Sequence, residues 1–261
     1  MGLALLDNPL ILSILFYPQA APMDENPPPG IIDGTLPAAE DVVLGYRFYI
    51  HEPHAPVILH FHGNGEIASD YDDIAPLYHR AGASLLVVDY RGYGWSTGQP
   101  KVSTLISDTE AVHDALPTIL ERAGVSSGFL FVMGRSLGSA CAIHLAHEHP
   151  ASFAGLIVES GFAHAIPLLA RLGLPAERLA GLPDPIGNAR KIAQVDLPLL
   201  VIHGERDSLI PVGNGQALYD ASPSERKHMV RIPGAGHNDL LYIGQDAYFA
   251  AIREFIVETT P

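Results

Sequence analysis

Short, mainly apolar runs alternate with longer segments of mixed polarity along most of the chain. Apolar runs of this length are typical of strands that are buried on both faces of a sheet. Residues 42–50 alternate enough between apolar and polar side chains to predict an early antiparallel strand. Further strands are predicted at residues 57–61, 84–89, 129–133, 155–159, 199–202 and 228–232.

The segments between these strands carry the helical pattern. Helices are predicted near residues 71–81, over 103–122 with Gly124 as the C-terminal stop, over 139–147 and over 245–257. Because strands and helices alternate, the predicted fold class is α/β, with a mostly parallel central sheet flanked by helices. Ligands of such sheets bind beyond the carboxyl ends of the strands.

Two segments depart from this alternation. Residues 1–41 hold an apolar run and a proline-rich stretch, which predict an extended arm before one α/β domain over 42–261. Residues of about 162–196 combine prolines with aliphatic side chains between two predicted strands. They predict a small cap that lines an apolar pocket, with a short helix opened by Pro175 and closed by Gly181. A plain crossover helix with a loop is the alternative.

Composition narrows the classes of function. A length of 261 residues with 48% hydrophobic content suits one folded domain with a large core. The net charge of −14 argues against nucleic-acid partners and anionic lipid surfaces, and favours neutral or cationic small substrates. The single cysteine, Cys141, excludes an intrachain disulfide and a cysteine-based metal cluster.

The apolar run Leu10–Tyr17 resembles a membrane segment in composition only. It is too short to cross a bilayer, and no Lys or Arg precedes it as in a signal peptide. We expect it to pack against the domain, with no stable membrane insertion and a cytoplasmic location. Peripheral contact with a membrane is the less favoured alternative.

The predicted strand 129–133 leads into Gly134-Arg-Ser-Leu-Gly138, and a predicted helix follows. Strand, G-x-S-x-G and helix together form the context of a nucleophile elbow, which exposes the serine hydroxyl on a sharp turn. The glycines leave room for the turn, and the helix N-terminus directs N–H groups toward a forming oxyanion. We predict Ser136 as a nucleophile; an ordinary strand-to-helix turn is the alternative.

A serine nucleophile needs a base that accepts its proton and an acid that orients the base. Asp207 follows the predicted strand 199–202, and His237 follows the predicted strand 228–232 in a glycine-rich loop. Both should therefore reach the sheet edge where Ser136 lies, in the chain order serine, acid, histidine. We predict a catalytic triad of Ser136, Asp207 and His237.

Other residues are weaker candidates for these roles. Glu159 ends its own strand and is the alternative acid, because triads are recognised by geometry rather than by sequence position. Glu205 is interpreted as a surface charge, and Asp239 as a cap of the turn after His237. Ser160 precedes a glycine but has no elbow, so we do not expect it to be a nucleophile.

An oxyanion hole needs two backbone N–H donors. One is expected from Leu137, directly after the nucleophile. The other is expected from the loop after strand 57–61, where we predict the Asn64 N–H, with Gly65 in reserve. His62, at the start of the same loop, is given a structural role.

The histidines suggest a metal site at first sight. His144, His147 and His149 cluster near the end of one predicted helix, but no carboxylate stands at a useful spacing. Histidines near a helix C-terminus are also favoured by the helix dipole. We therefore predict no metal and no cofactor.

Five motifs occur in the order found in one large superfamily. Together they resemble the α/β-hydrolase superfamily of serine hydrolases, and in particular its esterase-like and depalmitoylase-like branch. The resemblance covers roughly residue 42 to the C-terminus and implies an α/β-hydrolase fold with a small cap insertion. The motifs are His62-Gly-Asn-Gly, Asp89-Tyr-Arg-Gly-Tyr-Gly94, Gly134-Arg-Ser-Leu-Gly138, His203-Gly-x-x-Asp207 and Gly236-His-Asn238.

The chain departs from this family pattern in two places. Ser139 stands where many relatives carry a second glycine, which is a mild change because serine is small. The N-terminal apolar run is short, whereas several relatives have a true membrane anchor. The stretch Asp89–Gly94 is usually a structural loop near the site in such proteins, so it receives no catalytic role.

These observations predict an enzyme of the carboxylesterase type, which cleaves carboxylic esters through an acyl-enzyme intermediate. Its partner is expected to be a small acyl ester with a short to medium chain. Acyl-thioesterase or peptidase activity with the same triad is the nearer alternative. A catalytically silent ligand-binding protein on the same fold is the alternative from another class.

Overall fold

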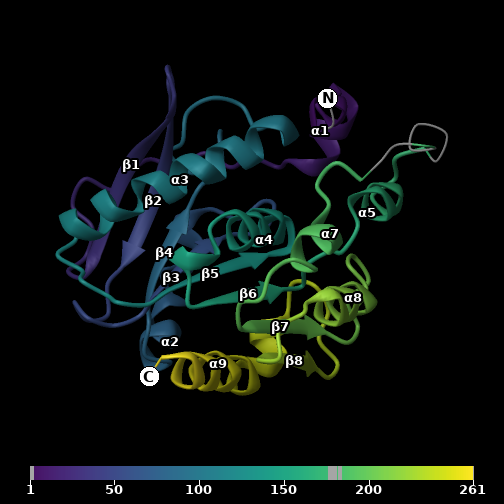
Figure 1. The fold of residues 1–261 in the computed structure, drawn as a ribbon. Coiled ribbons are helices and arrows are strands. Elements are labelled where there is room, and N and C mark those ends of the chain that lie inside the picture. Colours follow the sequence, from purple (N-terminus) through teal and green to yellow (C-terminus); the bar gives the residue numbers. More distant parts are fainter. Residues whose placement is uncertain (1–2, 176–180, 182–183, 261) are drawn as a thin grey trace.

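The computed structural model describes residues 3–175, 181 and 184–260, in which the strands form one eight-stranded sheet (Figure 1). The strand order is β1-β2-β4-β3-β5-β6-β7-β8. Strand β2 is antiparallel to both of its neighbours, and all other neighbouring strands are parallel. The bounds are β1 Ile31–Ala39, β2 Val42–Tyr49, β3 Val57–Phe61, β4 Ser84–Val88, β5 Leu130–Arg135, β6 Gly155–Glu159, β7 Leu199–Gly204 and β8 Lys227–Ile232.

Helices cover both faces of this sheet. Helices α3 and α4 lie on one side in Figure 1, and α2 and α9 lie on the other. The described helices are α1 Pro9–Leu15, α2 Ala75–Arg80, α3 Val102–Arg122, α4 Ser139–Glu148, α5 Ala165–Arg171, α7 Asn188–Ile192, α8 Gly213–Ala221 and α9 Leu240–Thr259. The α/β fold with a mostly parallel, helix-flanked sheet is therefore confirmed.

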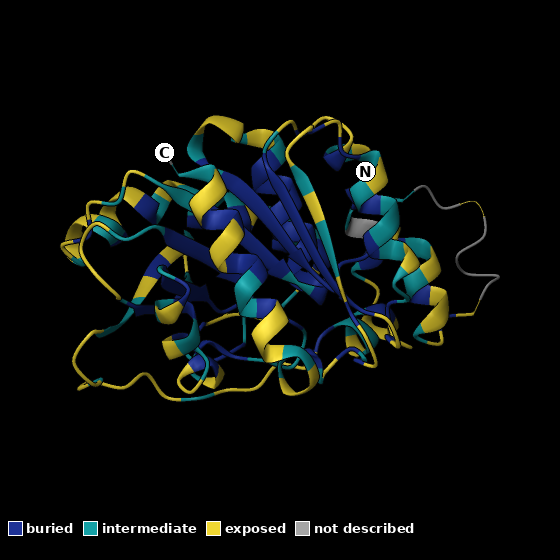
Figure 2. Cartoon of the chain, turned by 90° about the horizontal axis from the view of Figure 1, so that it is seen from below, coloured by how far each residue is buried: buried dark blue, intermediate teal, exposed yellow. Residues whose placement is uncertain are grey.

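Successive side chains of each central strand enter two separate cores. In β3, Leu59 packs into the core on the α3 and α4 side, and its neighbour Ile58 packs into the core on the α2 and α9 side. Both are fully buried, and Figure 2 shows the central strands in dark blue between helices with exposed outer faces. Burial on both faces explains why the strands read as nearly continuous apolar runs.

Strand β1 lies within the residues that we interpreted as an extended arm. It pairs with β2 from Ile31 opposite Tyr49 to Ala39 opposite Val42, with an irregularity in the register after Pro37. Pro37 lies within the strand and has no backbone donor, which is tolerated because β1 is at the edge of the sheet. Because the region is rich in proline, its sequence pattern did not predict this strand.

Two helices differ in extent from their predictions. A short 3₁₀ turn at Ala68–Tyr71 precedes α2, whose first turn contains Pro76, a residue suited to a helix start. Helix α9 begins at Leu240 and passes over a kink at Gly244. A Cβ at Gly244 would lie 2.3 Å from Cγ2 of Ile232, so the absent side chain lets α9 approach β8.

Helix α5, from the segment predicted as a cap, and helix α1, from the N-terminal run, both lie at the carboxyl ends of the parallel strands (Figure 1). Helix α5 forms the start of the cap, and the helix expected between Pro175 and Gly181 falls on residues outside the described part. Helix α1 packs against the domain, with Ile11 and Phe16 buried. Within the described residues, no helix combines the length and the apolar character that a membrane span requires.

Candidate active site

Ser136 occupies a strained turn between β5 and α4. Its φ is 51°, a left-handed conformation that is uncommon for residues other than glycine. The flanking glycines are required by space: a Cβ on Gly134 would lie 2.2 Å from the carbonyl oxygen of Gly138, and one on Gly138 would lie 2.0 Å from that of Phe61. The structure thus places Ser136 in the elbow that the G-x-S-x-G pattern predicts.

Replacing Gly138 with alanine is expected to damage this turn. Because the new methyl group would collide with backbone at the end of β3, we expect a loss of about 1–3 kcal/mol in the free energy of unfolding. Denaturant unfolding monitored by circular dichroism measures it. Gly128→Ala is the matched control, since a Cβ there meets nothing within 4 Å. Equal stability of the two variants would contradict the expectation.

The structure brings Ser136, His237 and Asp207 into one hydrogen-bonded chain. Nε2 of His237 lies 2.9 Å from Oγ of Ser136, and Nδ1 of His237 lies 2.7 Å from Oδ2 of Asp207. A carboxylate at Nδ1 assigns the ring proton to that nitrogen, so Nε2 is left to accept the serine proton. All three side chains are buried or nearly so. The arrangement can perform nucleophilic acyl transfer.

Asp207 is held as a carboxylate by four groups. Its Oδ1 accepts the N–H groups of Leu209 at 2.9 Å and Ile210 at 2.7 Å. Burial alone would raise the pKa of Asp207, but hydrogen bonds from His203, His237 and the Ile210 N–H outweigh it and hold the pKa well below the usual range. The carboxyl group of Asp207 is therefore ionised at neutral pH.

In the sequence, His203 is identifiable only as the first residue of the motif His203-Gly-x-x-Asp207. Its Nε2 lies 2.7 Å from the carbonyl oxygen of Ile210 and 3.4 Å from Oδ2 of Asp207. The ring is fully buried, and its position as the last but one residue of β7 was the available signal. We interpret His203 as a positioning residue for the loop that carries Asp207.

The weaker candidates have other partners. Oε1 of Glu159 lies 3.1 Å from Nε of Arg135, and its Oε2 accepts the hydroxyl of Tyr248 at 2.7 Å. Glu159 therefore does not orient His237. Oδ1 of Asp239 accepts the Gly236 N–H at 2.5 Å, which stabilises the turn that carries His237.

The loop after β3 lies beside the elbow. Leu137 and Asn64 both line the cavity into which Ser136 opens. The side-chain oxygen of Asn64 accepts the Tyr93 hydroxyl at 2.6 Å and the Tyr17 N–H at 2.9 Å. His62 starts this loop with Nδ1 2.8 Å from the carbonyl oxygen of Gly63, a contact that fits a structural role.

Arg135 connects three segments of the site and was not anticipated. It forms ion pairs with Glu66 after the β3 loop and with Glu159 at the end of β6. Its Nη2 also donates to the carbonyl oxygen of His237 at 2.9 Å and to Oδ1 of Asn238 at 3.0 Å. Arg135 occupies the first variable position of G-x-S-x-G. Because the motif specifies no residue type there, it contains no signal for the role of Arg135. One guanidinium thus ties the elbow to the β3 loop and to the histidine loop.

The two carboxylates of this cluster respond differently to burial. Burial raises the pKa of Glu66, but the Arg135 charge and further contacts outweigh it and lower the pKa below the usual value. Its Oε2 accepts the Gly63 N–H at 2.8 Å and the Tyr71 hydroxyl at 2.9 Å. Burial dominates at Glu159, so its pKa stays raised despite Arg135.

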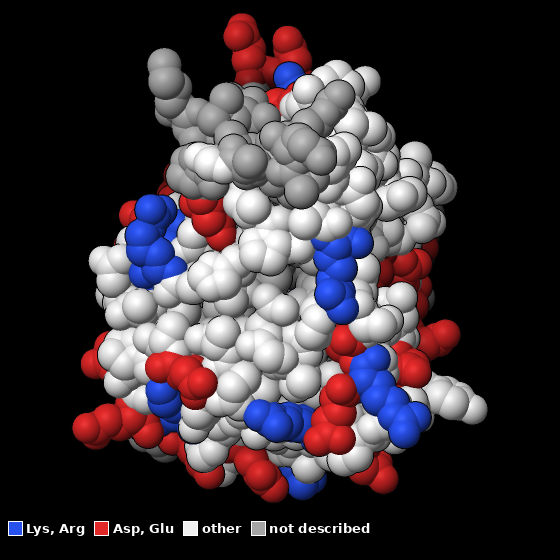
Figure 3. Space-filling model, turned by 90° about the vertical axis from the view of Figure 1, so that its right-hand side faces the viewer, with Lys and Arg blue, Asp and Glu red and all other residues white. Residues whose placement is uncertain are grey.

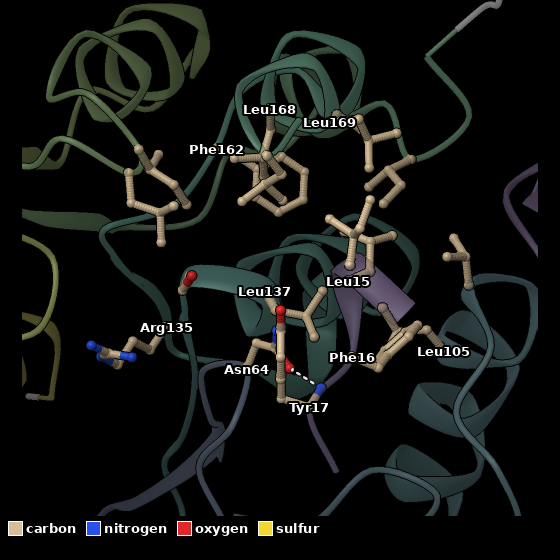
Figure 4. A pocket seen from close by; sticks show the side chains of 18 of the residues that line it. Leu15, Phe16, Tyr17, Asn64, Leu105, Arg135, Leu137, Phe162, Leu168 and Leu169 are labelled. Atoms are coloured by element: carbon tan, nitrogen blue, oxygen red, sulfur yellow. Dashed lines mark hydrogen bonds between the residues drawn. The ribbon is translucent and has the colours of Figure 1, made fainter. Parts of the chain in front are cut away.

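An apolar cavity of about 330 Å³ opens at Ser136 (Figure 4). Leu168 and Leu169 of α5 and Phe162 line one side of it, and Leu137 lies opposite. The face at the carboxyl ends of the strands is uncharged over much of its middle, with charged side chains toward its margins (Figure 3). The described surroundings of Ser136 therefore suit an apolar, uncharged substrate group. Further lining residues are Leu6, Ile14, Leu15, Phe16, Val102, Leu105 and Leu172.

Two of the three histidines considered for a metal contact the carboxylate of Glu110, and the third, His147, contacts Glu148. Nε2 of His144 lies 2.5 Å from Oε1 of Glu110, and Nε2 of His149 lies 2.7 Å from its Oε2. Among the described residues, no group of three or more His, Cys, Asp or Glu side chains has a geometry that could hold a metal ion.

Comparison with known protein families assigns the chain to one of them. A family model described as serine aminopeptidase, S33, matches residues 52–184 and 187–241. The chain belongs to this family of the α/β-hydrolase superfamily. The resemblance to the α/β-hydrolase superfamily that the motifs indicated is thereby confirmed.

The sequences of two relatives align with most of the sequence of this hydrolase. The uncharacterized protein Rv2307c of Mycobacterium tuberculosis is 32% identical over 94% of this chain and 87% of its own length. Alpha/beta hydrolase domain-containing protein 17C of Mus musculus is 32% identical over 85% of this chain and 67% of its own length.

Solved structures share the fold of this hydrolase. The Pyrococcus furiosus esterase Pf2001 superposes with a TM-score of 0.73 at 18% identity, over 93% of this chain and 100% of the esterase. A soluble variant of monoglyceride lipase from Saccharomyces cerevisiae superposes with a TM-score of 0.68 at 17% identity, over 91% and 97% of the two chains.

Proposed function

We propose that this hydrolase cleaves carboxylic esters through an acyl-enzyme, with Ser136 as nucleophile. The observation that carries the proposal is the hydrogen-bonded arrangement from Asp207 through His237 to Ser136, whose serine and histidine line an apolar cavity. The substrate is a small ester whose acyl chain lies in this cavity. The esterase and lipase among the solved structures that share the fold support the same reaction class.

In the first half-reaction, Oγ of Ser136 attacks the ester carbonyl while Nε2 of His237 takes the hydroxyl proton. The negative Asp207 carboxylate stabilises the doubly protonated imidazole and keeps its orientation. The N–H groups of Leu137 and Asn64 are assigned to the developing oxyanion. His237 then gives its proton to the leaving alkoxide, so an alcohol departs and the acyl group stays on Ser136.

In the second half-reaction, His237 accepts a proton from water, which attacks the acyl-enzyme carbonyl. The tetrahedral intermediate collapses, Ser136 regains its proton from His237, and the carboxylic acid leaves. No step requires a metal or an organic cofactor. The same sequence applies to a thioester, in which a thiol replaces the alcohol as leaving group.

The lining of the cavity favours an ester over the N-terminus of a peptide. An aminopeptidase substrate brings an ammonium group close to the scissile bond, and a buried ammonium needs a carboxylate partner. Within the described residues, no Asp or Glu lines the cavity at Ser136. The nearby carboxylates of Glu66 and Glu159 are paired with Arg135.

The proposal is tested by comparing substrates of equal acyl length: a p-nitrophenyl ester, a thioester and an N-terminally free p-nitroanilide. We expect the largest kcat/KM for the ester, and labelling of Ser136 by a fluorophosphonate probe. Ser136→Ala should lose both the hydrolysis and the label. Absence of labelling in the wild-type enzyme would favour a catalytically silent binding protein, and preference for the anilide would favour a peptidase.

A further inference from the structure

Hydrogen bonds and buried side chains fix the N-terminal segment to the domain beside the site. The side-chain oxygen of Asn8 accepts the Leu10 N–H at 3.0 Å and caps α1. The carboxylate of Asp7 accepts the Ser103 N–H at 3.0 Å, at the start of α3. Leu6 and Phe16 are 1% and 6% exposed, a degree of burial typical of core residues. Both ends of α1 are therefore fixed to the domain.

Beyond α1, the chain is attached to the loop that carries the proposed oxyanion donor. The Tyr17 N–H donates to Oδ1 of Asn64 at 2.9 Å, and Nε2 of Gln19 donates to the carbonyl oxygen of Gly65 at 2.6 Å. The Gly94 N–H donates to the carbonyl oxygen of Gln19 at 2.8 Å, and the segment continues as a short β-bridge. These bonds place residues 17–19 in a defined register against the β3 loop.

The same segment supplies one side of the cavity. We call Leu6, Ile14, Leu15 and Phe16 the N-terminal wall; all four line the cavity that contains Ser136. In Figure 4, Leu15, Phe16 and Leu105 of α3 lie on the side of the cavity remote from Arg135. Because Arg135 directly precedes Ser136, this wall lies across the cavity from the backbone of the elbow.

The chemistry of the wall matches a saturated acyl chain. Its side chains are aliphatic or aromatic, and residues 8–23 include no Asp, Glu, Lys or Arg. A cavity of about 330 Å³ lies at the small end of the range typical of ligand pockets, roughly 300–1,000 Å³. Each further methylene must therefore displace a side chain once the wall is reached.

We propose that the N-terminal wall forms the distal end of the acyl-binding site and sets the longest acyl chain that the enzyme accepts. This inference rests on the proposed function, since it concerns the acyl group carried by Ser136. The N-terminal segment thus has a role in specificity in addition to its packing role. The substrate class is a neutral ester of a saturated, short to medium carboxylic acid.

The test varies the volume of one wall residue. Leu15→Trp fills the distal end of the cavity, and Leu15→Ala enlarges it. On p-nitrophenyl esters from acetyl to palmitoyl, we expect Leu15→Trp to lower kcat/KM for the longest accepted chains by roughly 10-fold or more relative to its value for acetyl. Leu15→Ala should move the optimum toward longer chains. The opposite shifts of the two variants exclude a general loss of stability as the cause.

Leu10→Trp is the matched control, because Leu10 lies on the same helix, is 41% exposed and is absent from the cavity lining. Its acyl-length profile should equal that of the wild type. Labelling rates with short-chain and long-chain alkyl fluorophosphonates give a second readout that does not depend on ester turnover. Profiles of both Leu15 variants that superimpose on the control would overturn the inference. A wild-type enzyme that is labelled with chain-length dependence, yet hydrolyses no ester, would contradict the proposed function alone.

Discussion

Replacing His237 with alanine is expected to lower kcat on p-nitrophenyl esters by about 10⁶-fold, as when the base of a comparable serine triad is removed. Without the imidazole, the Ser136 hydroxyl at 2.9 Å has no group to accept its proton. Steady-state or single-turnover hydrolysis measures the effect. His228→Ala is the control, since this exposed histidine pairs with Glu258 at 3.1 Å, away from the site. A loss below about 100-fold would place the base elsewhere.

Asp207→Asn should cost about 10⁴-fold, because an amide favours the wrong tautomer of His237. The double variant should be scarcely worse than His237→Ala, because the three residues act as a unit.

The low pKa of Asp207 also sets a pH dependence of stability. A carboxyl with a depressed folded-state pKa stabilises the fold above its unfolded value, about 3.9, and loses that contribution as the pH falls. The stability gap between wild type and Asp207→Asn should therefore narrow below about pH 4.

The second large effect is expected at Arg135. Arg135→Met removes the cation between Glu66 and Glu159, whose side chains are 25% and 5% exposed. Because breaking a buried pair leaves uncompensated charge, the free energy of unfolding should fall by about 3–5 kcal/mol. The activity should fall as well, since the carbonyl oxygen of His237 loses its donor. Denaturant unfolding at neutral pH and ester hydrolysis measure the two losses.

The pH dependence separates this explanation from a simple packing defect. Without Arg135, the pKa values of Glu66 and Glu159 both rise, because its charge is the largest influence that lowers each of them. A rise in the folded-state pKa of a carboxyl costs stability above its unfolded value of about 4.3, and this cost is lost as the pH falls. The deficit of Arg135→Met should therefore shrink as the pH falls. Adding Glu66→Gln and Glu159→Gln should restore part of the stability. Arg80→Met, at an exposed position of α2, is the control; a pH-independent deficit would contradict a charge effect.

Local patterns in the sequence were sufficient for most of the fold. The parallel strands are buried on both faces, so each reads as an apolar run, and the glycine and proline signals between them mark the connections. Strand β1 was missed because Gly34 and Pro37 interrupt its pattern, and only its pairing with Tyr49 and Leu44 in β2 makes it a strand. An edge strand is stabilised by its neighbour more than by its own residues.

The triad could be proposed from the sequence because each member follows a recognisable strand. Parallel strands deliver their carboxyl ends to one edge, so Ser136, Asp207 and His237 were predicted to meet before any distance was known. The order along the chain and the glycine spacing carried this information. These features are local and are dictated by backbone geometry, which is why they are readable.

Two features of the site were decided by the tertiary structure alone. Arg135 joins Glu66 and His237, and Tyr17 joins Asn64, although these residues lie far apart in the chain. No periodicity links such residues, because their contact depends on the packing of the whole sheet and its loops. The sequence by itself determined the fold class, the elbow and the three residues that meet in the hydrogen-bonded arrangement of Ser136, His237 and Asp207. Only the folded chain decided which contacts order the loops around these three residues and which side chains line the cavity, because both depend on segments that are far apart in the sequence.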